Sequence, residues 1–141
     1  MPKTSKKTTI SKAKKKAWDA FSKYIRLRDC LKTTGTPDEG ICVTCPSRTS
    51  FKYANAGHFV PDRSRYLLFD EQGVHLQCVQ CNIYKKGNWV PYERFMLETY
   101  GPEVTEQIKQ NKYQSGTWSI PELEEIEEVY KCKFQELTAT I

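Results

Sequence analysis

The sequence predicts an α+β fold in which a small metal-stabilised core is flanked by N-terminal and C-terminal helices. Two C-x-x-C pairs, Cys42–Cys45 and Cys78–Cys81, have 32 residues between them, and the segments around them are short and punctuated by Pro, Gly, Asn and Asp. Amphipathic periodicity before and after this region indicates the helices. With 141 residues, of which 38% are apolar and 28% charged, the chain fits one modest domain with extensions.

The N-terminal part divides into an arm and a helix. Residues 1–12 contain almost nothing that could enter a core, so we expect a disordered basic arm. A basic amphipathic helix is predicted over 13–32, because Trp18, Phe21 and Ile25 recur at intervals of three and four residues.

Charge is unevenly distributed along the chain. Residues 1–32 hold eleven Lys/Arg and two Asp/Glu, whereas the remainder holds eleven and fifteen. A basic segment before a mildly acidic body favours a polyanionic partner, most simply nucleic acid, although a solvated lysine tail is the alternative. No apolar run approaches the roughly 20 residues of a membrane span, and no signal peptide pattern follows the basic start. We therefore expect a cytoplasmic protein with no membrane partner.

After a turn-rich loop over 33–40, residues 41–101 are expected to form the core. Pro91 fits the first turn of a helix and Gly101 fits its C-terminal stop. Residues 102–141 are expected to form a helical extension, with one helix near 102–112.

The last helix is predicted to begin at Ser119 to Pro121, with glutamates near its positive N-terminal end. Its apolar residues share one stripe, which must pack on the body or on a second subunit. We expect a homodimer, with this helix as the first candidate interface. The stripe contains Leu123, Ile126, Tyr130, Phe134 and Leu137.

The C-x-x-C spacing lets one tight turn present two thiolates to one tetrahedral ion. In a reducing compartment, structural Zn²⁺ bound by Cys42, Cys45, Cys78 and Cys81 is favoured over two disulfides or unrelated thiols. Four thiolates fill the coordination sphere, so this ion would stabilise the fold and do no chemistry itself. The other two cysteines, Cys30 and Cys132, lack such a partner and are expected to be ordinary thiols.

Several short motifs lie between and after the cysteine pairs. A histidine on a strand, a returning segment and C-x-x-C followed by Asn at the start of a helix resemble the zinc-stabilised HNH, or ββα-metal, nuclease motif. More specific motifs are FSKYIRLRD at 21–29, Ala56-Gly57-His58, Val74-His75, Gln77-Cys78, Cys81-Asn82, Gly87-Asn88 and Trp118. Through these motifs, over about Lys12 to Leu137, the chain is similar to the NinG (Rap) family of phage recombination proteins. The C-x-x-C-Asn junction is also shared with the endonuclease VII type of Holliday-junction resolvase.

The resemblance implies a structure-selective DNA endonuclease that acts on Holliday junctions, D-loops and other branched DNA in phage recombination. His58 would be the general base, since a neutral imidazole can take a proton from water at physiological pH. Asn82 would offer an amide oxygen to a catalytic Mg²⁺, with Mn²⁺ as a possible substitute. Because many HNH sites have an acidic ligand where this chain has Gly57, the second metal ligand is open, with Asp62 and His75 as candidates.

The central Asn of the HNH motif would fall at Gly73, which has no side chain. The interaction that orients His58 would then come from a backbone carbonyl or from His75, which is also a catalytic candidate. A competing interpretation is a non-catalytic zinc-containing module that binds nucleic acid or a replication protein. A third is a sequence-specific homing or restriction nuclease.

Ten residues are expected to contact DNA, mostly through phosphates, with solvated surface charge as the alternative for the basic ones and a turn-forming role for the asparagine. They are Lys14, Lys15, Lys16, Arg26, Arg28, Arg63, Arg65, Lys85, Lys86 and Asn88.

Overall fold

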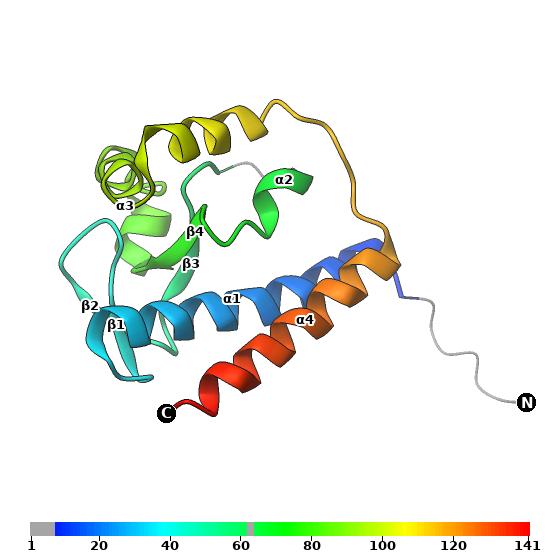
Figure 1. The fold of residues 1–141 in the computed structure, drawn as a ribbon, viewed down its shortest axis with the longest axis horizontal. Coiled ribbons are helices and arrows are strands. Elements are labelled where there is room, and N and C mark those ends of the chain that lie inside the picture. Colours follow the sequence, from blue (N-terminus) through cyan, green and yellow to red (C-terminus); the bar gives the residue numbers. More distant parts are fainter. Residues whose placement is uncertain (1–7, 62–63) are drawn as a thin grey trace, which may run out of the picture.

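The computed structural model describes residues 8–61 and 64–141. Two long terminal helices, α1 and α4, lie side by side along one edge (Figure 1). Strands β1 and β2 lie at the C-terminal end of α1, and the other strands and helices lie above it. The predicted α+β class is confirmed. The elements are α1 Ile10–Thr34, β1 Glu39–Ile41, β2 Arg48–Ser50, β3 Asn55–His58, α2 Arg65–Leu68, β4 Val74–Gln77, η1 Gln80–Tyr84, α3 Trp89–Asn111 and α4 Ile120–Thr138.

Helix α1 begins three residues earlier than predicted. The Thr9 side chain caps it by accepting a hydrogen bond from the Lys12 amide at 3.2 Å. Ala13 and Ala17 are buried against Leu123 of α4, so the first predicted turn packs on the body. Residues 10–12, which were predicted to belong to the disordered arm, are helical and exposed. The part of the predicted arm at 1–7 lies outside the described residues.

Helix α4 has the capping box that its sequence indicates, with Ser119 and Glu122 exchanging side-chain-to-backbone hydrogen bonds. Its apolar stripe packs on α1 of the same chain. Tyr130 meets Phe21 edge to face at 4.8 Å between ring centroids, and Leu123 is fully buried. The part of the stripe formed by Leu123, Ile126 and Tyr130 is thus covered within one chain, while the predicted dimer stays a prediction.

Two antiparallel hairpins form the centre of the molecule. The β1–β2 turn contains the first cysteine pair, and the second pair lies where β4 passes into η1. In the β3–β4 hairpin, Gly57 pairs with His75 and His58 pairs with Val74. The succession of hairpin and helix is the order that the HNH resemblance implies.

Helix α3 is two helices joined at Gly101, whose φ of 85° and ψ of 171° are not helical. Pro102 follows and cannot donate a backbone hydrogen bond, so the chain restarts there. This break confirms the predicted stop at Gly101. Within the described ranges, no helix is both long enough and apolar enough to span a membrane.

Candidate metal centre and active site

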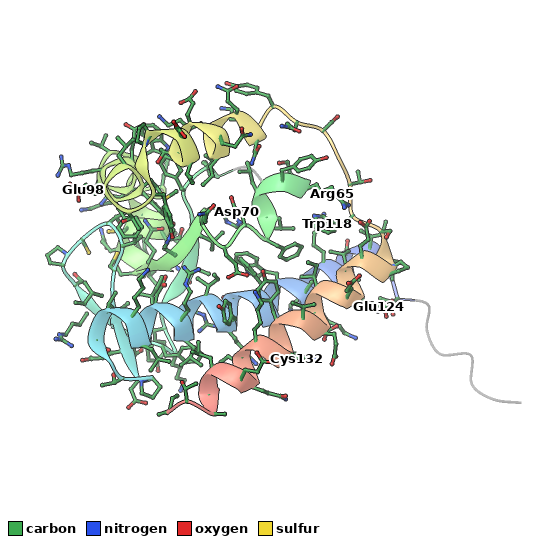
Figure 2. The ribbon with its side chains drawn as sticks, in the orientation of Figure 1. Arg65, Asp70, Glu98, Trp118, Glu124 and Cys132 are labelled. Carbon is green, nitrogen blue, oxygen red and sulfur yellow. The ribbon has the colours of Figure 1, made fainter. Side chains whose placement is uncertain are left out.

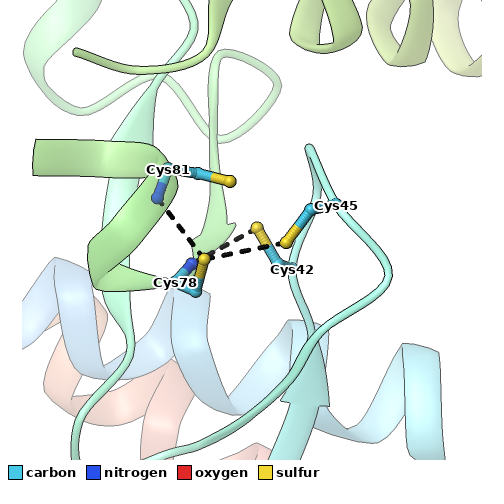
Figure 3. A group of neighbouring side chains, drawn as sticks. All are labelled: Cys42, Cys45, Cys78 and Cys81. Atoms are coloured by element: carbon cyan, nitrogen blue, oxygen red, sulfur yellow. Dashed lines mark hydrogen bonds between the residues drawn. The ribbon is translucent and has the colours of Figure 1, made fainter. Parts of the chain in front are cut away.

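Cys42, Cys45, Cys78 and Cys81 converge on one point (Figure 3). Their sulfur atoms all lie within 4.8 Å of one another. The Cys45 and Cys78 sulfurs are 3.7 Å apart. A tetrahedral Zn²⁺ with bonds of about 2.3 Å holds its sulfurs about 3.8 Å apart, so the spacing fits such an ion. The predicted convergence of the two C-x-x-C pairs is confirmed, and the group can bind a metal such as zinc.

Backbone amides support the thiolates. The Thr44 and Cys78 amides donate to Cys42 Sγ at 3.4 and 3.3 Å, and the Cys81 amide donates to Cys78 Sγ at 3.4 Å. Such donors lower the cost of gathering negative sulfurs around an ion. All six cysteines are free thiols in this structure, with Cys30 buried and Cys132 exposed on α4 (Figure 2).

Asn88 also belongs to this centre. Its side-chain amide donates to the Thr44 carbonyl oxygen at 3.3 Å and to Cys81 Sγ at 3.5 Å. Its backbone is left-handed, with a φ of 47°, at the start of α3. The side-chain amide of Asn88 is thus directed at the four-cysteine centre, and its predicted contact with DNA stays a prediction.

His58 ends strand β3 and is held from two sides. Its ring stacks on Trp18 of α1, with 5.1 Å between centroids and 18° between planes. Its Nε2 lies 3.1 Å from the Leu68 carbonyl oxygen. Because a carbonyl oxygen can only accept, Nε2 carries the proton in this hydrogen bond, and the lone pair of neutral imidazole is then on Nδ1. A backbone carbonyl was one of the two predicted ways of orienting this ring.

Asn82 lies in η1, beside the strand position that precedes His58. A Cβ atom added to Gly57 would lie 3.1 Å from Asn82 Oδ1. Side chains alternate along a strand, so Gly57 and its pair His75 face η1 and α3, whereas the His58 ring faces α1. Asn82 and His58 therefore approach the end of β3 from opposite faces, at adjacent positions of the strand.

Gln77 fills the space that the missing Gly57 side chain leaves. A Cβ atom at position 57 would lie only 2.0 Å from Gln77 Oε1. The Gln77 Nε2 donates to Thr44 Oγ1 at 3.0 Å and to the Gly87 carbonyl oxygen at 2.8 Å. Its Oε1 is buried and accepts no hydrogen bond within the described part of the chain. Gln77 was not among the predicted site residues: it pairs with Asn55 and reaches Gly57 across the β3–β4 hairpin, and the sequence carries no signal of that register.

His75 is 4% exposed and uses both ring nitrogens. Tyr92 donates its single hydroxyl proton to the Gly57 carbonyl oxygen at 2.6 Å, so it accepts from His75 Nδ1 at 3.0 Å. Nε2 then accepts from the Tyr100 hydroxyl at 2.8 Å. Burial lowers the pKa of His75 to about 3 and raises the pKa values of both tyrosines.

The His75 chain of hydrogen bonds therefore anchors α3 to the backbone carbonyl of Gly57. A buried neutral ring with both nitrogens occupied can reach neither a catalytic water nor a metal ion. This geometry corrects the expectation that His75 is catalytic or a Mg²⁺ ligand. Asp62, the other candidate ligand, and Arg63 lie outside the described residues.

Three arginines predicted to contact phosphates have partners within the protein, Arg26 and Arg28 in partly buried positions and Arg65 at the surface. Arg26 donates to a backbone carbonyl just after β2 at 2.7 Å. Arg28 pairs with Asp29 at 2.8 Å and donates to two carbonyls, one before β4 and one within it, at 2.8 and 3.0 Å. Arg65 pairs with Glu122 at 2.6 Å beside the indole ring that precedes α4 (Figure 2). The predicted lysines differ from them: Lys15, Lys16, Lys85 and Lys86 are exposed, and Lys14 is half-buried.

The sequence is similar to those of known phage proteins. A family model described as Bacteriophage Lambda NinG protein matches residues 3–139. Curated relatives named Protein ninG, from Escherichia phage 933W and Escherichia phage lambda, are each 33% identical to this chain over 124 residues, and one from Salmonella phage P22 is 32% identical. The alignments cover 87% of this chain and 56 to 57% of those relatives, so the chain spans little more than half their length. No solved structure matches.

Proposed function

This chain belongs to the NinG family of bacteriophage proteins, and on that premise we propose that it is a structure-selective DNA endonuclease of phage recombination. Its substrates would be Holliday junctions, D-loops and related branched DNA. The observation that carries the proposal is the position of Asn82 Oδ1 against Gly57, one residue before His58, on a hairpin whose following turn belongs to the four-cysteine centre.

Hydrolysis of a phosphodiester needs a deprotonated water in line with the leaving oxygen. His58 would take the proton at Nδ1, because Nε2 is held by the Leu68 carbonyl. The same carbonyl would stabilise the imidazolium that forms, as would the face of the Trp18 indole ring. His58 would thus remain in one orientation through proton transfer.

Asn82 would hold the catalytic Mg²⁺ through its amide oxygen. The ion, when bound, neutralises charge that develops on the phosphate and the leaving oxygen. A single protein ligand is compatible with Mg²⁺, which keeps several waters and accepts phosphate oxygens. Gln77 Oε1, a buried oxygen without a hydrogen-bond partner among the described residues, supports a water or hydrated cation beside Gly57.

The four-cysteine centre would support catalysis through position alone. Asn82 follows Cys81 directly, and Gln77 precedes Cys78 while binding Thr44 between the first two cysteines. Zinc in this centre would therefore fix both carboxamides against β3. A Cys₄ site leaves no open coordination position, so the hydrolytic step belongs to His58 and Asn82.

Recognition would depend on phosphate contacts and DNA shape rather than on base sequence. The exposed Lys85 and Lys86 follow η1 directly and are suited to phosphate contacts near the cleavage site. A twofold dimer would match the paired cleavage sites of a symmetric junction. Since α1 covers Leu123, Ile126 and Tyr130, a dimer would use a surface beyond this part of α4. The protein would act in the host cytoplasm.

The decisive experiment incubates a synthetic four-way junction with wild type, His58→Ala, Asn82→Ala and the control Gln135→Ala, which changes an exposed residue of α4. Mg²⁺ is added or omitted, without a chelator, so that the cysteine-bound metal is retained. We expect Mg²⁺-dependent cutting by wild type and control, and cutting slower by about 100-fold or more in the two site variants. Junction binding by all four should be similar.

Two results would contradict the proposal. Junction binding without any Mg²⁺-dependent cutting by wild type would indicate the non-catalytic zinc module. Cutting of linear duplex at one defined sequence, with the junction intact, would indicate a sequence-specific nuclease.

A further inference from the structure

Two aromatic side chains stand open to solvent on one side of α3. Trp89, at the start of α3, is 42% exposed, and Tyr113, just past its end, is 74% exposed. Both line a hollow of about 350 Å³ that lies against Val60 and Pro61, the residues that follow the catalytic strand. This volume falls in the range of about 300 to 1,000 Å³ that small-ligand sites occupy.

Lysines accompany both rings. The Lys109 ammonium lies 5.2 Å from the Trp89 ring centroid, and the Lys112 ammonium lies 5.2 Å from the Tyr113 ring centroid. Lys109 also pairs with Glu93, so Lys112 is the cation of this group that no ion pair engages among the described residues. Aromatic faces interleaved with lysines are the pattern with which proteins bind single-stranded nucleic acid.

The hollow lies close to the proposed cleavage site. Trp89 stacks on Phe59, with 5.5 Å between ring centroids and 16° between planes. Phe59 is two residues beyond Gly57 on the same face of the extended chain, which corresponds to about 7 Å along the strand. Asn82 contacts that face at Gly57. The Trp89 indole therefore packs on the same face of the extended chain that Asn82 contacts, two residues further along it.

We propose that this hollow is a stacking site for an unpaired nucleobase of the DNA substrate, with Trp89 and Tyr113 as its aromatic walls. The inference rests on the proposed function for DNA as the partner, and it adds the feature that is recognised. Bases inside a duplex already stack on each other, whereas bases at a branch point, flap or bulge can turn out into an aromatic hollow. Stacking tolerates any base, so it selects DNA structure without reading sequence.

The test uses two oligonucleotide duplexes that carry the fluorescent base 2-aminopurine, either unpaired in a short bulge or fully paired. Binding is measured without added divalent cation, so that no cutting is required. The variants are Trp89→Ala, Trp89→Phe and Tyr113→Ala. The matched control is Tyr53→Ala, because Tyr53 is 68% exposed and has the Lys52 ammonium 5.4 Å from its ring, yet lies outside the hollow.

We expect wild type to quench the unpaired probe and to bind the bulged duplex more tightly than the paired one. Trp89→Ala and Tyr113→Ala should weaken bulge binding by about 5- to 150-fold, the range for removal of a base–aromatic stack, with Tyr113→Ala near the lower end. Trp89→Phe should retain most of the binding, and Tyr53→Ala should match wild type. Circular dichroism spectra separate misfolding from loss of the site, and Tyr113→Ala changes only an exposed residue.

The outcomes separate this inference from the nuclease assignment. Quenching and bulge preference that depend on Trp89 and Tyr113 in a protein that never cuts DNA would support the stacking site and overturn the nuclease. A protein that cuts junctions, but in which Trp89→Ala and Tyr113→Ala bind bulged DNA as tightly as wild type, would overturn the stacking site.

Discussion

Replacing Gly57 by alanine adds one methyl group at the most crowded point of the candidate active site. The new Cβ would lie 2.0 Å from Gln77 Oε1 and 3.0 Å from Gln77 Cδ. The end of a glutamine side chain is usually free to move. Here its Nε2 is fixed by hydrogen bonds of 3.0 Å to Thr44 Oγ1 and 2.8 Å to the Gly87 carbonyl oxygen. Relief of the clash requires a shift of about 1 Å or more, which breaks these bonds.

The cost can be worked out from those contacts. Each broken hydrogen bond removes about 0.5 to 1.5 kcal/mol, and a buried group left without its partner costs about 1 to 3 kcal/mol. We therefore expect Gly57→Ala to lower the free energy of unfolding by about 2 to 4 kcal/mol. The control is Gly35→Ala at the end of α1, where no atom lies within 4 Å of the added Cβ and only the φ of 77° opposes alanine. That change should cost about 1 kcal/mol.

Denaturant unfolding with zinc present measures both values, and the metal content of each variant is determined in parallel. The decisive comparison repeats Gly57→Ala in a Gln77→Ala background, where the clash is absent. There we expect Gly57→Ala to cost less than about 1 kcal/mol, a coupling typical of residues in contact. An equal cost in the two backgrounds would refute the clash as the cause.

Three further outcomes follow from the same structure. Cys45→Ser should reduce bound zinc well below one ion per chain and abolish cooperative unfolding, whereas Cys132→Ser, at an exposed thiol, should match wild type in metal analysis and melting. The pKa of buried His75 is about 3 in the folded protein and near 6.5 in the unfolded chain. Folding stability should therefore fall as the pH drops from 6.5 toward 3, by up to about 1.4 kcal/mol per pH unit. His75→Gln should flatten this part of a pH–stability profile. The logarithm of the DNA-binding constant falls with the logarithm of salt concentration, and deleting residues 1–7 should make this fall less steep by about 0.9 for each phosphate that the arm neutralises. An unchanged slope in a filter-binding titration would exclude the arm from DNA binding.

The features predicted correctly are those that short stretches of sequence encode. The spacing within Cys42–Cys45 is enough to indicate a pair of metal ligands, and Gly101 followed by a proline is enough to break a helix. The start of α1 was predicted three residues too late because residues 10–12 are exposed and carry no apolar stripe. The true start is set by the Thr9 side chain, which caps the helix through the Lys12 amide.

The features that were missed depend on pairing between distant segments. His75 was an open candidate because its spacing from Cys78 says nothing of Tyr92 and Tyr100, which reach it from α3. Arg28 was assigned to DNA because the sequence shows its charge and hides its hydrogen bonds, one of them to the carbonyl of Val74. These roles depend on the β3–β4 register and on the packing of α3. Neither can be predicted from the spacing of residues along the sequence.

The close packing of Gln77 against Gly57 also limits how this site could change over evolutionary time. An aspartate at position 57 would add a carboxylate beside Asn82, but its Cβ would occupy space already filled by the glutamine amide. A smaller residue at position 77 would have to arise first, at the expense of the ties to Thr44 and Gly87. A carboxylate could therefore enter position 57 only after position 77 has changed.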